Sequence, residues 1–185
     1  MTGVTGIAVA GLFAAGVCVA LVEVDRRHGG DLDGLSPQRV VAALAPGRYL
    51  GRGPYVYQRR EGECGPVCLA NLVLLTGRRD IDINALLHAF GDVQPGVSVR
   101  DLRAVGARFG LVTEFMRHAT FDDLETNLPG VLLVEPEHFV VVKECVGASF
   151  VVVDPALGMF EMTRAELSAI WGGVFIHVDV GSRVQ

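Results

Sequence analysis

The hydrophobic pattern of this chain changes its period near Leu111, and this change constrains the fold more than any other feature. Before Leu111, apolar residues recur at helical spacing, as in the run that contains Val67, Leu72 and Leu75. After it, short runs rich in Val, Phe and Leu are bounded by Pro, Gly and Asp, which is typical of strands separated by turns. Helices first and strands afterwards predict an α+β fold with an antiparallel sheet.

Capping and stop signals place the individual elements. Ser36 and Pro37 begin a short helix, Gly77 and Gly110 end two others, and Thr120 with Asp123 resembles a capping box. The expected helices cover about residues 36–45, 65–75, 83–90 and 98–109, with two more that begin at Thr120 and Thr163, the last carrying Leu167, Ile170 and Trp171. The expected strands are LVTEFM (111–116), GVLLVE (130–135), HFVVVKECV (138–146), SFVVVDP (149–155) and VFIHVDV (174–180), whereas LGRGPYVYQRREGE (50–63) is expected to be irregular.

The first 22 residues contain no charged side chain, and a helix of that length crosses a hydrocarbon core of roughly 30 Å. This run predicts a transmembrane anchor over residues 1–24, followed by a linker and short helix over 25–51 and a soluble domain over 52–185. Arg26 and Arg27 follow the run and no basic residue precedes it, which places the domain in the cytoplasm of a single-pass membrane protein. A cleaved signal peptide is the competing interpretation.

Charge and cysteine content exclude two classes of protein. The net charge is −5, and the scattered Lys and Arg form no basic stripe, so the chain is not expected to bind nucleic acid. Four cysteines in 185 residues are too few for a disulfide scaffold and are typical of a reducing compartment.

Cys64 is the candidate nucleophile, because it directly precedes the helix that contains Gly65 and Pro66. The partial positive charge at a helix N-terminus lowers the pKa of a thiol and favours the reactive thiolate. The alternative is a small buried hydrophobic residue, which is how most cysteines are used. Cys68, one turn further along the apolar face, is interpreted as a core residue.

Three polar residues complete a candidate site. His138 opens one strand and Asp154 ends the next, so a hairpin that turns near residues 146–148 brings both side chains to the same end, where a carboxylate can orient an imidazole base. Gln58 is a neutral donor that can bind the oxyanion formed by thiolate attack on a carbonyl. Taken singly, His138 is more typical of a surface histidine at a strand start, and Asp154 is more typical of an Asp-Pro turn.

The segments YQRREGECGPVCLANLVLL, PGVSVRDLRAVGARFGL, LPGVLLVEPEHFVVVKE and FVVVDPALG resemble the double-glycine-leader cysteine peptidase family, the papain-like peptidase domain of bacteriocin and peptide ABC exporters. The resemblance covers about residues 52–178. It implies a papain-like cysteine peptidase fold, with Cys64 as nucleophile, His138 as base, Asp154 as orienting residue and Gln58 in the oxyanion hole. It also implies a substrate with a Gly-Gly leader, whose amphipathic helix docks in a shallow apolar groove.

Two hypotheses from different classes follow. The first is a cysteine peptidase that cleaves leader peptides after Gly-Gly, with a separate ABC exporter or another membrane complex as partner. The second is a catalytically silent papain-like accessory subunit of such a complex. The chain contains no phosphate-binding Gly-rich loop with Lys, which excludes an ATPase role for this sequence.

No cofactor or metal is expected. Groupings of Glu135, Glu137 and His138, or of Cys64, Cys68 and Cys145, have no common zinc spacing, and metal binding would block the nucleophile. His118 and His177 are interpreted as structural or exposed residues, and Gly172-Gly173 as a helix stop.

Overall fold

An antiparallel sheet of seven strands is the centre of the computed structural model, which describes residues 46–94, 96–134 and 137–179. The strand order is β1-β6-β5-β4-β3-β7-β2, and every recorded pair is antiparallel. The strands are β1 (Arg48–Gly51), β2 (Val112–Met116), β3 (Gly130–Val134), β4 (His138–Val146), β5 (Ser149–Asp154), β6 (Gly158–Thr163) and β7 (Trp171–Asp179). The helices are α3 (Cys64–Leu75), α4 (Ile83–His88), α5 (Val99–Arg108), α6 (Phe121–Thr126) and α7 (Arg164–Ser168).

Side-chain caps fix the start of four helices. Asp82 accepts hydrogen bonds from the first backbone N–H groups of α4. Ser98, Thr120 and Thr163 each form a complete capping box at the start of α5, α6 and α7. Each cap satisfies backbone donors that have no partner within the helix, and it therefore places the helix start at a defined residue.

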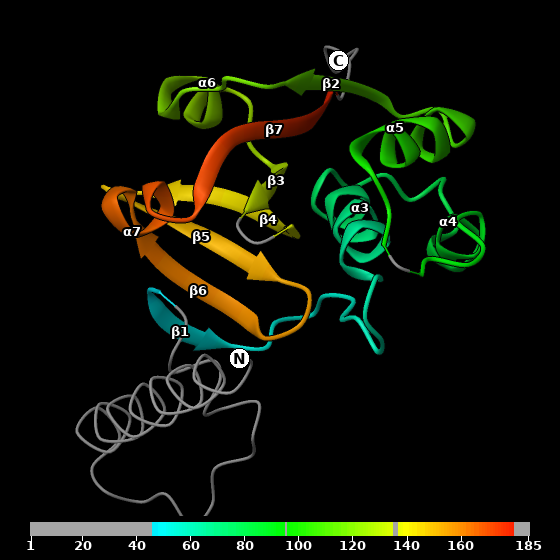
Figure 1. The fold of residues 1–185 in the computed structure, drawn as a ribbon, viewed down its shortest axis with the longest axis horizontal. Helices are drawn as coiled ribbons and strands as arrows, with labels where there is room; N and C mark the ends of the chain where they lie inside the picture. Colours follow the sequence, from blue (N-terminus) through cyan, green and yellow to red (C-terminus); the bar gives the residue numbers. More distant parts are fainter. Residues whose placement is uncertain (1–45, 95, 135–136, 180–185) are drawn as a thin grey trace, which may run out of the picture. The chain divides into compact units, whose positions relative to one another are not determined.

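Helix α3 is buried over most of its length, from Gly65 to Val73. It packs against β3 and β4 of the sheet and against α4 and α5. Leu69 and Leu72 of α3 share one hydrophobic core with Phe139, Val141 and Ile176 of the sheet. Figure 1 shows α3, α4 and α5 grouped beside the sheet, and α6 and α7 at the far side of the strands. The start of α3 is therefore held against the start of β4.

The α+β order predicted from the hydrophobic period is confirmed, and the five predicted strands are present. Two strands were missed. β6 alternates buried Phe160 and Met162 with the less buried Glu161, but the segment is too poor in β-branched residues to be recognised. β1 overlaps the first two residues of the stretch expected to be irregular, and within the described part of the chain it is an edge strand that pairs with β6 alone.

The C-terminal region differs from the prediction in two places. Helix α7 ends at Ser168, so Ile170 and Trp171 lie outside it. Gly172 and Gly173 do not stop a helix: they belong to β7, where the pairing with β3 shifts register and Gly173 has φ +81°. A bulge of this kind favours glycine because the backbone enters the left-handed region.

One prediction about the whole chain is wrong. Among the described residues no helix is long and apolar enough to cross a membrane, and this finding overturns the assignment as a single-pass membrane protein with a cytoplasmic domain. The segment on which that assignment depended, residues 1–24, lies outside the described residues, as does the helix expected at 36–45. The domain boundaries at 24/25 and 51/52 stay predictions.

Candidate active site

Cys64 is the first residue of α3, one position further into the helix than expected, and its side chain is half-buried. The preceding residue, Glu63, is the N-cap, and its carboxylate accepts the backbone N–H groups of Arg59 (2.7 Å) and Arg60 (3.1 Å). These two hydrogen bonds hold the loop of residues 59–62 against the start of the helix. Cys64 consequently lies among the free N–H groups of the first helical turn, where a negative charge is stabilised.

His138 and Asp154 meet although they lie on different strands. Nε2 of His138 is 3.1 Å from Oδ2 of Asp154. The other carboxylate oxygen, Oδ1, accepts the backbone N–H groups of Ala156 (2.7 Å) and Leu157 (3.0 Å) in the turn between β5 and β6. The turn therefore fixes the carboxylate, and the carboxylate leaves Nδ1 of His138 available for a second partner.

That second partner is Cys64. Burial by itself would raise the pKa of the Cys64 thiol. Hydrogen bonds with the His138 side chain and with the backbone N–H groups of Phe139 and Gly65, together with the charge of His138, bring this pKa below its ordinary value. Burial likewise opposes a charged imidazole, but hydrogen bonds to Asp154 and Cys64, and their charges, raise the pKa of His138 to about 9. Each group thus favours the charged form of the other.

Gln58 lies in the loop that runs past this site. Its backbone N–H donates to the carbonyl oxygen of Pro155 (2.8 Å), the residue after Asp154. Two residues earlier, both polar backbone groups of Val56 are bound by the buried side chain of Asn71: Val56 N donates to Oδ1 (2.8 Å), and Nδ2 donates to Val56 O (2.9 Å). Oε1 of Gln58 is buried and has no hydrogen-bond partner among the described residues.

Asn71 and the backbone of Phe139 are the members of this neighbourhood that the sequence interpretation missed. Asn71 is a polar residue inside the apolar run CLANLVLL, and a buried polar side chain needs a partner, so its position was a usable signal. Backbone N–H groups carry no such signal, because every non-proline residue has one.

The remaining candidates lie apart from this cluster or have other partners. Cys145 is exposed near the far end of β4, about 20 Å along the strand from His138. His177 is buried on β7, with Nε2 3.2 Å from Oε2 of Glu114, and it stacks on Phe175. Within the described part of the chain, no three His, Cys, Asp or Glu side chains group as metal ligands would.

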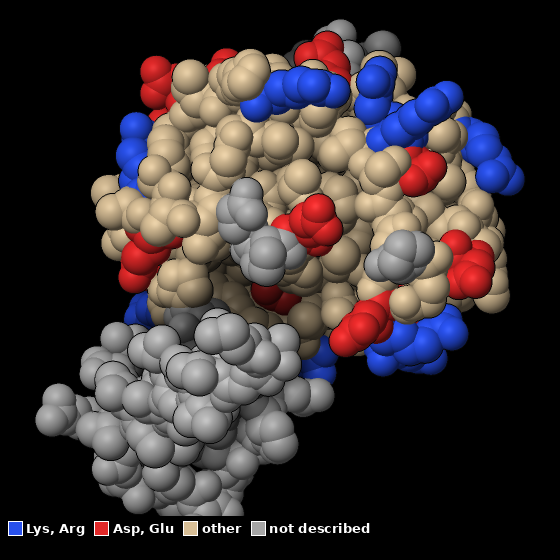
Figure 2. Space-filling view, in the orientation of Figure 1, with Lys and Arg blue, Asp and Glu red and all other residues tan. Residues whose placement is uncertain are grey.

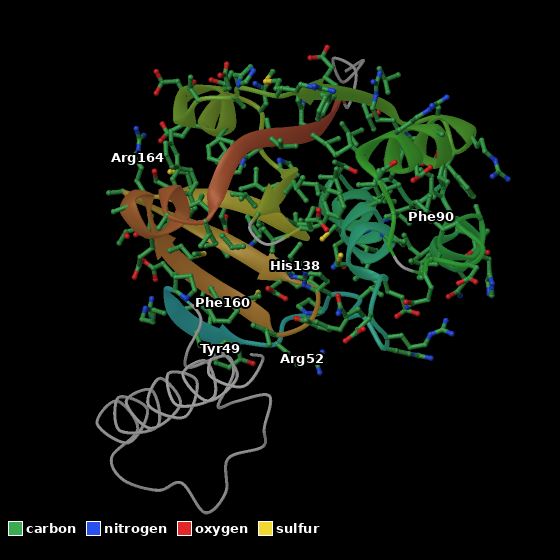
Figure 3. All side chains as sticks on the ribbon, in the orientation of Figure 1. Tyr49, Arg52, Phe90, His138, Phe160 and Arg164 are labelled. Carbon is green, nitrogen blue, oxygen red and sulfur yellow. The ribbon has the colours of Figure 1, made fainter. Side chains whose placement is uncertain are left out.

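His138 lies near the middle of the view in Figure 3. In Figure 2 the Lys and Arg side chains of this face lie at its rim, whereas acidic side chains lie near its middle as well as at the rim. A hollow of about 780 Å³ opens beside the start of α3. Its wall includes Tyr57 and Glu63, the neighbours of Gln58 and Cys64, and the apolar side chains of Val67, Ile83 and Leu87.

A helical group packed on an antiparallel sheet, with a cysteine at a helix start facing a histidine and an aspartate on the sheet, defines the papain-like class of fold. Residues 52–182 match the Peptidase C39 family, and the chain belongs to this family.

Curated relatives include two bacterial proteins. The chain is 28% identical over 148 residues to the colicin V secretion/processing ATP-binding protein CvaB of Escherichia coli, covering 80% of this chain and 21% of the relative. It is 27% identical over 127 residues to the lactococcin-G-processing and transport ATP-binding protein LagD of Lactococcus lactis subsp. lactis, covering 65% of this chain and 18% of the relative. The chain thus spans about a fifth of the length of these relatives.

Two solved structures have a similar fold. One is a double glycine motif protease from an AMS/PCAT transporter in complex with the leader peptide, with a TM-score of 0.59, 20% identity and coverage of 71% of this chain and 96% of that one. The other is the peptidase domain of Streptococcus ComA, a bi-functional ABC transporter, with a TM-score of 0.58, 19% identity and coverage of 66% and 95%.

Proposed function

We propose that this protein is a cysteine peptidase that cleaves leader peptides after a Gly-Gly pair. The observation that carries the proposal is the juxtaposition of three groups: a thiol whose pKa is lowered at the start of α3, and a histidine that interacts with it while Nε2 lies 3.1 Å from the Asp154 carboxylate. A nucleophile, a base within reach and a group that orients the base are the requirements of covalent catalysis.

The first step follows from the two pKa shifts. Between the lowered pKa of Cys64 and the pKa of His138 near 9, the charged pair is the favoured form. The thiolate adds to the carbonyl carbon of the scissile bond and the carbonyl oxygen becomes an oxyanion. His138 then transfers its proton to the departing amine, the C–N bond breaks and a thioester remains on Cys64.

The second step returns the enzyme to its starting state. Neutral His138 takes a proton from a water molecule, the resulting hydroxide adds to the thioester, and the carboxylic acid leaves as the C–S bond breaks. Gln58 stabilises the oxyanion in both steps if its carboxamide nitrogen faces the thiol. A rotation of the terminal torsion exchanges this nitrogen with the buried, unpartnered Oε1.

Support for the substrate comes from the relatives and from the surface. One structure of similar fold is a double glycine motif protease bound to a leader peptide, and two relatives are named for secretion or transport together with processing. The Lys and Arg side chains of this face lie at its rim, so the middle of the face, where His138 lies, suits a peptide better than a polyanion. The hollow beside α3 combines apolar side chains such as Val67 and Leu87 with charged ones such as Arg60, and it offers a surface for the part of the leader that precedes the glycines.

A partner follows from the same relatives. They are secretion or transport ATP-binding proteins, and the region that matches this chain is about a fifth of their length. The proposal therefore includes association with a separate peptide exporter or another membrane complex, to which the cleaved peptide is delivered.

Steady-state cleavage of synthetic leaders by the full-length chain tests the function. We expect cleavage after Gly-Gly, no cleavage when both glycines are replaced by alanine, and loss of nearly all turnover in Cys64→Ala and His138→Ala. Cys145→Ser is the matched control, because Cys145 is exposed and remote from the site. If no Gly-Gly peptide is cleaved while the leaders still bind, the protein is instead a silent papain-like binding subunit.

A further inference from the structure

Cys68 lies one helical turn after Cys64 and contacts no solvent. Its Sγ–H donates to the carbonyl oxygen of Phe139 at 3.2 Å. Burial raises the pKa of the Cys68 thiol well above its ordinary value, so the sulfur keeps its proton at neutral pH and stays a donor.

Phe139 directly follows His138 at the start of β4, where it pairs with Leu133 of β3 on one side but, among the described residues, has no partner in β5 on the other side. The recorded pairing of β4 with β5 begins at Val141, opposite Val153, and β5 ends at Asp154. Continuing this register by two residues would place Phe139 opposite Pro155, which has no N–H to donate. The Cys68 thiol instead supplies the hydrogen-bond donor for the carbonyl oxygen of Phe139 at this end of β4.

The two polar groups of Phe139 thus face two cysteines of the same helix. Its carbonyl oxygen accepts from Cys68, and its backbone N–H donates to Cys64. On an extended strand the N–H and C=O of one residue point to the same side, so a single helix can bind both.

We propose that Cys68 is a positioning residue, which through its hydrogen bond to Phe139 O aims Phe139 N–H and the adjacent His138 at the Cys64 sulfur. The role rests on the proposed function, in which Cys64 is the nucleophile, but it concerns the thiolate before any substrate binds. It differs from the role of a small core residue, because the core needs only the volume of the side chain whereas the positioning role needs its donor.

The test is the pH dependence of Cys64 alkylation by iodoacetamide in the full-length chain, with the modified residue located by mass spectrometry. The titratable groups around the Cys64 sulfur are His138 on β4, Asp154 on β5 and Cys68 on α3. Glu63 directly precedes Cys64 in the chain. Cys68→Ala and Cys68→Val remove the donor with opposite changes of volume, and Cys68→Ser retains a donor. Cys145→Ser is the control for the loss of an unrelated thiol. Thermal unfolding followed by circular dichroism shows that each variant is folded.

We expect the pH midpoint of Cys64 alkylation to rise by about half a pH unit to one pH unit in both Cys68→Ala and Cys68→Val. The reason is that one hydrogen bond changes the ratio of thiolate to thiol by about threefold to tenfold. Cys68→Ser should stay near the unsubstituted protein, even though a buried hydroxyl lowers its melting temperature more than alanine does. A midpoint unchanged in Ala and Val, or one that follows melting temperature across the three variants, overturns the proposal. Because no peptide is used, the result is independent of whether a Gly-Gly substrate is cleaved.

Discussion

At the residue scale, the site depends on a carboxylate that binds in two directions. One oxygen of Asp154 accepts two backbone N–H groups of the following turn, and the other accepts from His138. The orientation of the imidazole is therefore set by the backbone of the β5–β6 connection. The residue that begins an Asp-Pro turn also binds the imidazole of His138, so the two interpretations of Asp154 are compatible.

Because each carboxylate oxygen of Asp154 has its own partners, two substitutions of this residue should have different effects on activity and stability. Asn retains an oxygen for the turn but presents an N–H₂ group to His138, so Asp154→Asn should lower turnover of a Gly-Gly peptide by about two to four orders of magnitude while the turn keeps its acceptor. Asp154→Ala also leaves the N–H groups of Ala156 and Leu157 without their acceptor and should cost about a further 1–3 kcal/mol of unfolding free energy. Kinetics and urea denaturation measure the two effects. Equal stability of the two variants would contradict the role of the turn.

The raised pKa of His138 makes the contribution of Asp154 to stability dependent on pH. A folded pKa near 9, above the usual 6.5, means that the folded state binds the proton more tightly. The resulting stabilisation is complete below about pH 6.5 and is lost as the pH rises through about 9. We expect Asp154→Asn to lower the unfolding free energy more at pH 6 than at pH 9.5.

Asp123→Asn provides the control for this pH dependence. Hydrogen bonds from the backbone and side chain of Thr120 lower the pKa of Asp123, so its carboxylate is charged at both pH values. Asp123→Asn should therefore lower the unfolding free energy by the same amount at pH 6 and at pH 9.5. A cost for Asp154→Asn that also does not change with pH would rule out a protonated His138 in the folded protein.

At the scale of elements, α3 organises the site. It presents Cys64 at its first turn, binds the start of β4 through Cys68 and binds the loop before Gln58 through Asn71. A helix buried on nearly all sides holds such groups more rigidly than a loop does. The close approach to β4 also depends on Gly65, where a Cβ would lie 2.4 Å from Cγ2 of Val97 and 3.2 Å from Cδ2 of Phe139.

Removing the amide of Asn71 should be costly. Asn71→Leu leaves both polar groups of Val56 without their partner in a partly buried loop, and we expect a loss of about 2–4 kcal/mol of unfolding free energy. Asn84→Leu, on the exposed surface of α4, should change stability by about 0.5 kcal/mol or less. Urea denaturation of both variants measures the difference, and similar values would show that the Val56 contacts contribute little.

Gly65 and Gly172 form a second matched pair. Alanine normally favours a helix over glycine, yet Gly65→Ala should destabilise the protein by about 1–3 kcal/mol because the added methyl group overlaps Val97. Gly172→Ala meets no atom within 4 Å and should be close to neutral. Melting temperatures of the two variants check this order, which would be reversed if helix propensity dominated at Gly65.

These elements also show what the sequence could and could not predict. Period, caps and glycine stops located α3, α5 and most of the sheet, because each depends on residues close in sequence. Edge strand β1 and the bulge in β7 depend on strand partners that lie far away in the chain. β6 directly follows its partner β5, but its sequence has few β-branched residues to indicate a strand. His138 and Asp154 were found because one hairpin joins them, whereas the contacts of Asn71 and Cys68 depend on packing between a helix and distant segments.

At the scale of the whole molecule, the site is assembled from both parts of the fold. Cys64 belongs to the helical group, and His138 and Asp154 belong to the sheet, so the contact of α3 with β4 brings the three side chains together. Residues Gly47–Gln185 form one unit, and a unit of this size usually unfolds in a single cooperative transition. The lowered pKa of Cys64 should therefore exist only while the entire unit is folded.

Alkylation pulses in increasing urea at pH 7 test this coupling in the full-length chain. We expect rapid labelling of Cys64 to fall to the rate of exposed Cys145 over the same urea range in which fully buried Cys68 first becomes labelled and the circular dichroism signal is lost. The reason is that one event, separation of α3 from β4, removes the partners of Cys64 and exposes Cys68 together. If Cys64 loses its rapid labelling at a lower urea concentration than the one at which Cys68 becomes labelled, the start of α3 opens by itself. The reactivity of Cys64 is then controlled by local unfolding of that turn.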